Sequence, residues 1–363
     1  MKFGLFAMPA HPPERDLKQG FDWDLQVIRW LDELGYGEAW VGEHHTVPWE
    51  PNPAPDLLLV RAIAETANIR LGPGGFLLPM HHPAALASRL VMLDHLSGGR
   101  LNFGLAASSI PTDQQLFGIS PADIRAMTRE SLEIILGLWE QSKPFAHEGR
   151  FWKVRRPEPQ YGIFTPHLYP VQQPHPPIGV AGLSPSSDTL RWAGERGFMP
   201  MSLNLNANYL SGHWTAVEAG AASAGRTADR NDWRMVREVL VADTDEEAWK
   251  LAVDGAMGRM TREYSLKVVQ AFGALPFLKH DPAVADSDVT VEYLARTSWL
   301  IGSPATVAAK IEDLYHQVGG FGVLLALGFD YLDQPEAWRR SLELLAGEVA
   351  PRLKHLNPDA ATA

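Results

Sequence analysis

The chain has 363 residues, of which 45% are hydrophobic, and a formal net charge of −11 at pH 7. A chain of this length and composition can bury a large core, either as one large α/β domain or as two ordinary domains. The negative charge argues against nucleic acid or an anionic membrane as the partner, because both bind basic surfaces. The absence of cysteine excludes disulfides, thiolate nucleophiles, iron–sulfur clusters and cysteine-type zinc sites.

The N-terminus leads directly into a strand-like segment, Phe3 to Phe6. The sequence has neither the apolar core of a signal peptide nor an apolar run of about 18 residues, the length that a membrane-spanning helix needs. We therefore expect a soluble, cytoplasmic protein that does not bind membranes.

Strand-like and helix-like segments alternate along the first third of the chain. Expected strands cover residues 3–6, 38–42, 69–78 and 101–106, and the helices between them cover residues 22–34, with Asp22 as the cap, 56–67, and 82 to about 97. This alternation is typical of parallel βαβ units, in which each strand returns across a helix.

The alternation continues to the C-terminus, with two interruptions. Further strands are expected at residues 178–182, 199–203, 235–242 and 322–328, and further helices at 124–139, 186–196, 246–264, 304–318 and 335–353. Eight strands with helices between them predict a single (β/α)8 TIM-barrel domain over residues 1–363, with insertions after strands 4 and 7. The excursions lie around residues 145–177, with a hairpin at 148–154, and around 265–298, a candidate lid.

In such a barrel, functional side chains follow the carboxyl ends of the strands. Glu43, His44 and His45 follow the second expected strand. The triplet has three interpretations: two metal ligands, a structural cluster, or one working histidine beside an orienting partner. Adjacent histidines in a strand point to opposite faces, which weakens the metal interpretation. Asp56, His81 and His82 keep that interpretation open, and we assign no metal ligand.

Two other strand ends suit a flat, phosphorylated ligand. Gly74-Gly75 inside a strand indicates either a bulge or the close approach of a ligand. The segment Gly182 to Ser187 places hydroxyls and backbone N–H groups at the start of a helix, which is either an anion site or a simple serine cap. Together these two features favour flavin mononucleotide (FMN).

Several motifs then occur in a characteristic order. They are Gly42–His45, Gly72–Pro79, His82-Pro83, Leu93–Arg100, Phe103-Gly104, Phe117-Gly118, Ser184-Pro185-x-Ser187 and Gly302–Val307. On these motifs the chain resembles the bacterial luciferase-like family of flavin-dependent monooxygenases over nearly its whole length. The resemblance implies a TIM barrel that takes reduced FMN from a separate flavin reductase or, in one branch, uses a deazaflavin to move hydride.

The resemblance also implies roles for individual residues. His44 matches the family's active-site histidine, which lies near the reactive edge of the flavin, and Glu43 is expected to be its buried neighbour. Gly74 and Gly75, followed by Phe76, match a strand position that often holds a non-prolyl cis peptide against the isoalloxazine. The expected phosphate-binding turn comprises Gly182, Ser184, Ser186 and Ser187, with Thr189 as a further candidate.

One position departs from the luciferases. They carry a phosphate-binding arginine just after the fourth strand, where this chain has Ala107, Ser108 and Ser109. We therefore expect hydroxyl and backbone N–H groups, with Ala107 and Ser108 among the contacts, to hold the phosphate, and the flavin to be a transient co-substrate.

Within the family, the chain looks most like the terpene and cyclic-ketone monooxygenases. This resemblance implies a two-component enzyme that uses reduced FMN and O2 to oxygenate a small apolar substrate. Baeyer–Villiger oxidation is one of the reactions that it includes. Met8, Trp49 and Leu78 are the expected substrate contacts. The alternatives are a deazaflavin-dependent oxidoreductase, a flavin-binding protein without turnover, and a metal-dependent hydrolase. Residues 57–67 and 84–96 correspond to the dimer face of relatives, so we expect a homodimer.

Overall fold

A parallel sheet of nine strands forms the centre of the computed structural model, which describes residues 1–141, 144–184 and 187–356. Around the sheet the strands follow the order β3-β2-β1-β13-β10-β9-β8-β5-β4. Their bounds are β1 Lys2–Ala7, β2 Glu38–Val41, β3 Arg70–Pro73, β4 Phe76–Leu77, β5 Phe103–Ala106, β8 Ile178–Gly182, β9 Met199–Ser202, β10 Arg234–Arg237 and β13 Val323–Leu327.

The two end strands of this order, β3 and β4, are consecutive in the chain and share one position in the barrel. β3 pairs with β2 and β4 pairs with β5, and Gly74 and Gly75 lie between them. A parallel bridge between Leu71 and Leu101 closes the ring, with Asn102 N–H donating to the Leu71 carbonyl at 2.9 Å. The nine strands thus fill eight positions, and the predicted TIM barrel is confirmed.

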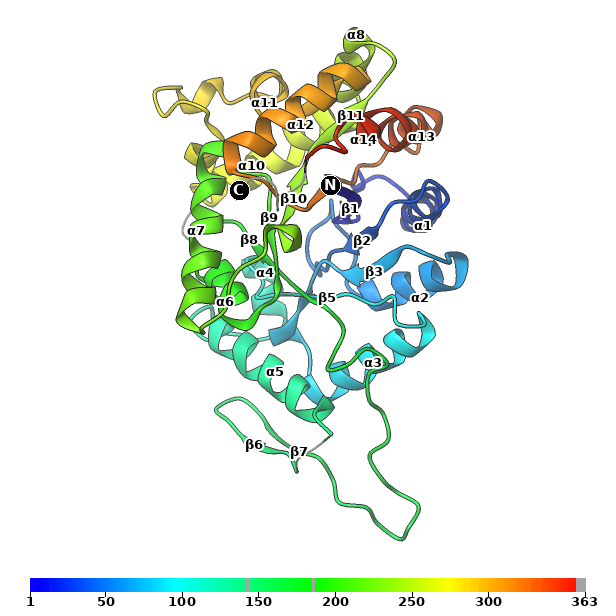
Figure 1. Cartoon of the computed structure of the whole chain (residues 1–363), viewed down its shortest axis with the longest axis vertical. Helices are drawn as coiled ribbons and strands as arrows, with labels where there is room; N and C mark the ends of the chain where they lie inside the picture. Colours follow the sequence, from blue (N-terminus) through cyan, green and yellow to red (C-terminus); the bar gives the residue numbers. More distant parts are fainter. Residues whose placement is uncertain (142–143, 185–186, 357–363) are drawn as a thin grey trace.

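Helices surround the barrel and cover its outer face (Figure 1). Their bounds are α1 Leu17–Glu33, α2 Pro55–Glu65, α3 Pro83–Leu96, α4 Pro111–Leu116, α5 Ile124–Trp139, α6 Asp188–Arg196, α7 Ala207–Ser223, α8 Asp245–Trp249, α9 Ala256–Met260, α10 Leu266–Ala271, α11 Val291–Thr297, α12 Pro304–Val318, α13 Pro335–Leu344 and α14 Ala350–Arg352. None of the helices within the described ranges is both long and apolar enough to cross a membrane.

The barrel interior is a small apolar cluster with one ion pair at its amino end. The cluster consists of Phe6, Trp40, Met199, Met201, Val236, Val323 and Leu325. Below it, Arg234 Nε donates to Glu38 Oε1 at 3.1 Å, and Trp40 Nε1 donates to the same carboxylate at 3.0 Å. The amino end is therefore closed by satisfied polar groups, which leaves the carboxyl end as the open mouth.

Two insertions interrupt the barrel pattern. After β5, the antiparallel hairpin of β6 (Ala146–Glu148) and β7 (Lys153–Arg155) projects away from the barrel with the loop that follows it (Figure 1). After β10, β11 (Val239–Val241) leaves the barrel and pairs in parallel with β12 (Leu300–Gly302). Helices α8 to α11 lie between these two strands in the sequence.

Several predicted boundaries were wrong. The first helix begins at Leu17, because the Asp16 side chain, not Asp22, accepts a hydrogen bond from a first-turn N–H group, that of Gln19. The strand expected at 69–78 is divided at the glycine pair, and the strand expected at 235–242 is divided into β10 and β11. Four helices, α4, α7, α10 and α11, were not predicted from the sequence.

Candidate active site

The mouth of the barrel has an apolar floor. Met8, Ala181, Leu203 and Leu327 are partly buried and pack on the interior cluster from above. Each stands at or just after the carboxyl end of a different strand, namely β1, β8, β9 and β13. Sequence reasoning found Met8 and missed the other three, although the alternation of inward-facing residues along each strand is the signal that could have found them.

Gly74 and Gly75 form one side of this mouth and are joined by a cis peptide bond, as the family resemblance implied. A Cβ atom on Gly75 would lie 2.5 Å from the backbone nitrogen of Leu105. A side chain there would collide with strand β5, so only glycine lets the two segments approach so closely. Phe76 and Leu78, which follow, are fully buried.

Glu43 is buried under the mouth and organises the residues around it. Its carboxylate accepts hydrogen bonds from the backbone N–H of Leu77 at 3.0 Å and faces Nε2 of His45 at 2.8 Å and Nε2 of His81 at 2.9 Å. Burial opposes ionisation, but these hydrogen bonds outweigh it and lower the pKa of Glu43. Glu43 thus pairs with His45 and His81 rather than with His44, and it fixes the backbone next to Gly75.

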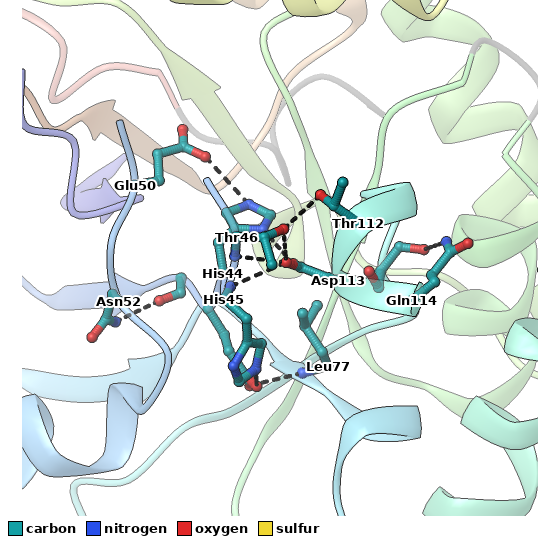
Figure 2. A network of polar contacts seen from close by, with 12 residues as sticks. His44, His45, Thr46, Glu50, Asn52, Leu77, Thr112, Asp113 and Gln114 are labelled. Carbon is teal, nitrogen blue, oxygen red and sulfur yellow. Dashed lines mark hydrogen bonds and ion pairs between the residues drawn. The ribbon is translucent and has the colours of Figure 1, made fainter. Parts of the chain in front are cut away.

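His44 lies between two carboxylates, Asp113 on one side and Glu50 on the other (Figure 2). Nδ1 of His44 is 3.5 Å from Asp113 Oδ2, and Nε2 is 3.3 Å from Glu50 Oε2. The imidazole is 13% exposed, so it is shielded but reachable from the mouth. Burial lowers its proton affinity, but the two carboxylates outweigh burial and raise the pKa of His44. The protonated imidazole can therefore act as an acid near neutral pH.

Asp113 was missed by sequence reasoning because it lies in the unpredicted helix α4. Its carboxylate accepts hydrogen bonds from the backbone N–H groups of Thr46, at 2.8 Å, and His45, at 3.3 Å, and from the Thr46 hydroxyl (Figure 2). Burial opposes ionisation, but the hydrogen bonds from His44, Thr46 and His45 outweigh it and lower the pKa of Asp113 to about 2. Asp113 is therefore a permanent negative charge beside His44.

Ser108, two residues after the end of β5, has a strained backbone and a hydroxyl group without a hydrogen-bond partner among the described residues. Its φ is 72°, in the left-handed region that side chains other than glycine rarely occupy. Its Oγ is buried and has no hydrogen-bond partner among the described residues, while its carbonyl accepts a hydrogen bond from Gln114 Nε2 at 3.3 Å. A buried hydroxyl without a partner is costly, so this group is a candidate ligand contact. Ala107, beside it, is partly exposed.

The predicted phosphate turn lies at the start of α6. Ser187 caps the helix by accepting a hydrogen bond from the backbone N–H of Leu190, and its hydroxyl contacts Thr189 Oγ1 at 3.0 Å. The backbone carbonyl of Ser184 lies 2.8 Å from Nε2 of the buried His213, and this contact holds Ser184 in place. Gly182 ends β8 beside this turn. The fourth expected contact, Ser186, lies outside the described residues.

Trp49 and Tyr264 lie beside Glu50 and contact each other. Their rings are stacked, with centroids 6.1 Å apart and an interplanar angle of 15°. The Tyr264 hydroxyl donates to Glu50 Oε2 at 2.9 Å. Trp49 was expected as a substrate contact, but Tyr264 was not expected at all. Trp49 also lines a cavity of about 260 Å³ with Ala10, Met260 and Tyr331.

Within the described residues, no group of three or more His, Cys, Asp or Glu side chains is placed to hold a metal ion. Glu43, His45 and His81 are instead linked by hydrogen bonds to one another and to the backbone. The chemistry that the arrangement offers is proton transfer by His44 above an apolar floor.

Other proteins resemble this one in sequence and in fold. Residues 1–320 match the family described as luciferase-like monooxygenase. The chain belongs to this family. Two members similar to it are the 3,6-diketocamphane 1,6-monooxygenase of Pseudomonas putida, 34% identical with 97% of this chain and 98% of the relative covered, and the limonene 1,2-monooxygenase of Rhodococcus erythropolis, 32% identical with 98% and 87% covered.

A solved structure agrees with these luciferase-like relatives. The oxygenating constituent of 3,6-diketocamphane monooxygenase from the CAM plasmid of Pseudomonas putida, a type II Baeyer–Villiger monooxygenase in complex with FMN, matches with a TM-score of 0.92. Its sequence is 35% identical, and the match covers 97% of this chain and 98% of the other. The predicted family and the predicted monooxygenase class are therefore confirmed.

Proposed function

We propose that this luciferase-like monooxygenase is the oxygenase component of a two-component system. It uses reduced FMN, supplied by a separate flavin reductase, and O2 to oxygenate a small apolar substrate, a terpenoid or a cyclic ketone, in the second case by Baeyer–Villiger oxidation. The observation that carries the proposal is His44 between two carboxylates at the edge of an apolar floor. Relatives named for diketocamphane and limonene support the substrate class.

The residues at the mouth fit FMN. The apolar floor, bordered by the glycine pair Gly74-Gly75, suits a flat ring. The unsatisfied hydroxyl of Ser108 needs a polar partner. The start of α6 offers the hydroxyls of Ser187 and Thr189 beside a helix N-terminus, where a phosphate is stabilised. These groups would hold the cofactor without an arginine after the fourth strand.

Reduced FMN, when bound, supplies the two electrons that activate O2. For a ketone, the overall reaction consumes the ketone, O2 and reduced FMN, and it yields the ester or lactone, water and oxidised FMN. The protein contributes the remaining functions. His44 holds and moves a proton at Nε2, and Asp113 keeps the imidazole oriented and protonated. The floor of Met8, Ala181, Leu203 and Leu327 limits the access of water.

Oxygenation is preferred over hydride transfer from a deazaflavin because the similar proteins are named as monooxygenases. Both relatives share more than 30% of their residues with this chain and are matched over at least 87% of their length. The similar structure contains FMN. A flavin-binding protein without turnover would not need a histidine whose protonation is controlled by two carboxylates.

We also propose that the enzyme is a cytoplasmic homodimer and that each chain is a single domain. The expected dimer face on α2 and α3 carries exposed apolar side chains, with Leu57 70% and Met92 61% exposed. Neighbouring apolar side chains of this kind on a soluble protein indicate an interaction site. Multi-angle light scattering tests this part, and a monomeric mass would contradict it.

The function is tested with the variant His44→Ala and the matched control His316→Ala, whose imidazole is exposed on α12, away from the expected dimer face. Chemically reduced FMN and a diketocamphane are mixed with oxygenated buffer, and the product is quantified. We expect His44→Ala to lower product formation by about 10² to 10⁴, the usual contribution of general acid–base catalysis. Affinity for reduced FMN should change little in either variant. Normal turnover by His44→Ala would contradict the assigned role.

A further inference from the structure

The two carboxylates beside His44 have different surroundings. Asp113 Oδ1 accepts hydrogen bonds from two backbone N–H groups and one hydroxyl, those of His45 and Thr46. In the part of the chain that the structure describes, Glu50 Oε2 has one hydrogen-bond donor, the hydroxyl of Tyr264, besides its contact with His44. Two carboxyl groups whose surroundings favour opposite protonation states take different roles at one site.

We propose that Glu50, held in place by Tyr264, is the group that returns a proton to Nε2 of His44 during turnover, whereas Asp113 is its fixed counter-ion. This inference rests on the proposed function, because it assumes that His44 gives up a proton in each cycle. Glu50 acts through His44 and is a positioning and proton-relay residue.

Protonation equilibria support the distinction between the two carboxyl groups. Burial is the main effect on Glu50 and raises its pKa, while His44 and Tyr264 lower it by less. The pKa of Asp113 is instead lowered to about 2, since its hydrogen bonds outweigh burial. Glu50 therefore takes up a proton at a higher pH than Asp113 does.

The geometry allows a balanced sequence of proton transfers. Protonated His44 gives the proton on Nε2 to an oxygen atom in the mouth and becomes neutral. Once His44 is neutral, the Tyr264 hydroxyl, 2.9 Å from Glu50, gives its proton to the Glu50 carboxylate and takes one from water. The carboxylic acid so formed, 3.3 Å from Nε2, gives its proton to His44 and becomes a carboxylate again. One proton is thus moved from solvent to the mouth in each cycle, and no other bond changes.

Tyr264 is placed to be the contact between Glu50 and solvent. It is partly exposed, whereas Glu50 is buried. It lies in the π-helical turn Thr261–Ser265 that follows α9. Such turns are rare in proteins overall, but many of them occur at functional sites. Its ring is fixed by stacking on Trp49, the residue next to Glu50 in the chain.

Other charged groups face this cluster and are already paired. Glu43, whose charge also acts on His44, is bonded to two other histidines. Arg259 lies over the Trp49 ring, 5.7 Å from its centroid, and its guanidinium contacts Glu14 at 2.6 Å and Glu263 at 3.2 Å. Within the described residues, Glu50 has no lysine or arginine partner, which agrees with its readiness to take a proton.

The relay is tested with Glu50→Gln and Tyr264→Phe, and Tyr36→Phe is the matched control. The Tyr36 hydroxyl also donates to a buried acceptor, the Leu342 carbonyl at 2.9 Å, but Tyr36 precedes β2 at the amino end of the barrel, opposite the mouth. The first measurement is the NMR titration of the His44 ring in the flavin-free protein. Interacting sites titrate in two coupled steps. We expect coupled steps in the wild-type protein and a single step in Glu50→Gln.

The second measurement is single-turnover product formation with reduced FMN in H2O and D2O. We expect Glu50→Gln to be slower by about tenfold or more, within the range of proton-transfer catalysis. Tyr264→Phe should be slower by a smaller factor with a larger solvent isotope effect, and Tyr36→Phe should match the wild-type protein.

The outcomes separate this inference from the proposed function. If the His44 titration is the same in Glu50→Gln as in the wild-type protein, or if Glu50→Gln and Tyr264→Phe both turn over normally, the relay is wrong even when His44→Ala is inactive. If His44→Ala is fully active, the proposed function is wrong, and with it the relay in turnover. If Glu50→Gln does not fold, Tyr264→Phe, which keeps the ring and its stacking, decides by its rate and isotope effect alone.

Discussion

His11 lies between two buried carboxylates and joins the first loop of the barrel to the last. Its Nδ1 is 2.9 Å from Asp330 Oδ2, its Nε2 is 3.1 Å from Asp24 Oδ2, and the residue is 2% exposed. Burial alone would lower its proton affinity, but the hydrogen bonds to Asp24 and Asp330 outweigh burial and raise the pKa of His11 to about 9. The folded protein therefore holds a proton on His11 that the unfolded chain loses at neutral pH.

This difference predicts how stability depends on pH. The contribution of His11 is complete below pH 6.5, the ordinary value, and it is lost as pH rises through about 9, the value in the folded protein. Because one pH unit corresponds to about 1.4 kcal/mol, the contribution is about 3 kcal/mol. Replacing His11 by glutamine removes this contribution and leaves Asp24 without a cation, whereas Asp330 keeps Arg15, whose Nε lies 3.0 Å from Oδ2. Breaking a buried ion pair costs about 3–5 kcal/mol.

The assay is thermal unfolding of the wild-type protein and His11→Gln at intervals from pH 6 to pH 10. The wild-type protein should melt several degrees higher at pH 6, and the difference should narrow steadily from about pH 6.5 to about pH 9, the interval in which the unfolded chain loses the histidine proton while the folded protein still holds it. Two parallel curves across this range would refute the reasoning, because they would show that His11 has the same charge in the folded and unfolded states.

Two further changes test the barrel itself. Gly75→Ala should lower the free energy of unfolding, measured by urea denaturation, by about 1–3 kcal/mol, because the added Cβ would lie 2.5 Å from the Leu105 nitrogen. The control Gly347→Ala, where a Cβ meets nothing within 4 Å, should not destabilise the protein. Equal effects of the two substitutions would argue against the collision. Arg234→Met should cost about 3–5 kcal/mol by leaving Glu38 buried without its partner, and the double variant Arg234→Met, Glu38→Leu should recover most of the loss. A double variant no more stable than the single one would show that the ion pair is not the cause.

The strand ends were the part of the site that sequence could predict. Glu43 and His44 follow a buried strand, and the glycine pair interrupts another, so the periodic pattern alone places them at the mouth. The floor residues Ala181, Leu203 and Leu327 carry the same signal more weakly, because a single apolar residue at a strand end is common.

The partners of His44 could not be predicted in the same way. Asp113 is 69 residues from His44 in the chain, in a helix of six residues that has no strong periodicity of its own. Tyr264 is 214 residues from Glu50 in the chain, and it is positioned by a π-helical turn that no local sequence pattern predicts. Glu43 was expected beside His44, but the chain leaves the extended conformation after Val41, so the alternation of a strand does not decide where its side chain points.

The loop that carries Glu50 is braced from both of its sides. The His11 backbone N–H donates to the Trp49 carbonyl at 2.8 Å, and the His44 backbone N–H donates to the Asn52 carbonyl at 3.0 Å. The first of these braces belongs to the segment that the protonated His11 side chain ties to Asp24 and Asp330.

Stability and proton transfer therefore depend on neighbouring parts of one loop, and both weaken as pH rises. Loss of the His11 proton above about pH 9 weakens the hydrogen bond at Trp49, and His44 and Glu50 also lose the protons that the relay passes on as pH rises. A decline of activity at high pH thus has two physical sources. The first source removes folded protein and is absent from His11→Gln, which has no proton to lose at this position. The second leaves the fold intact and is altered by Glu50→Gln.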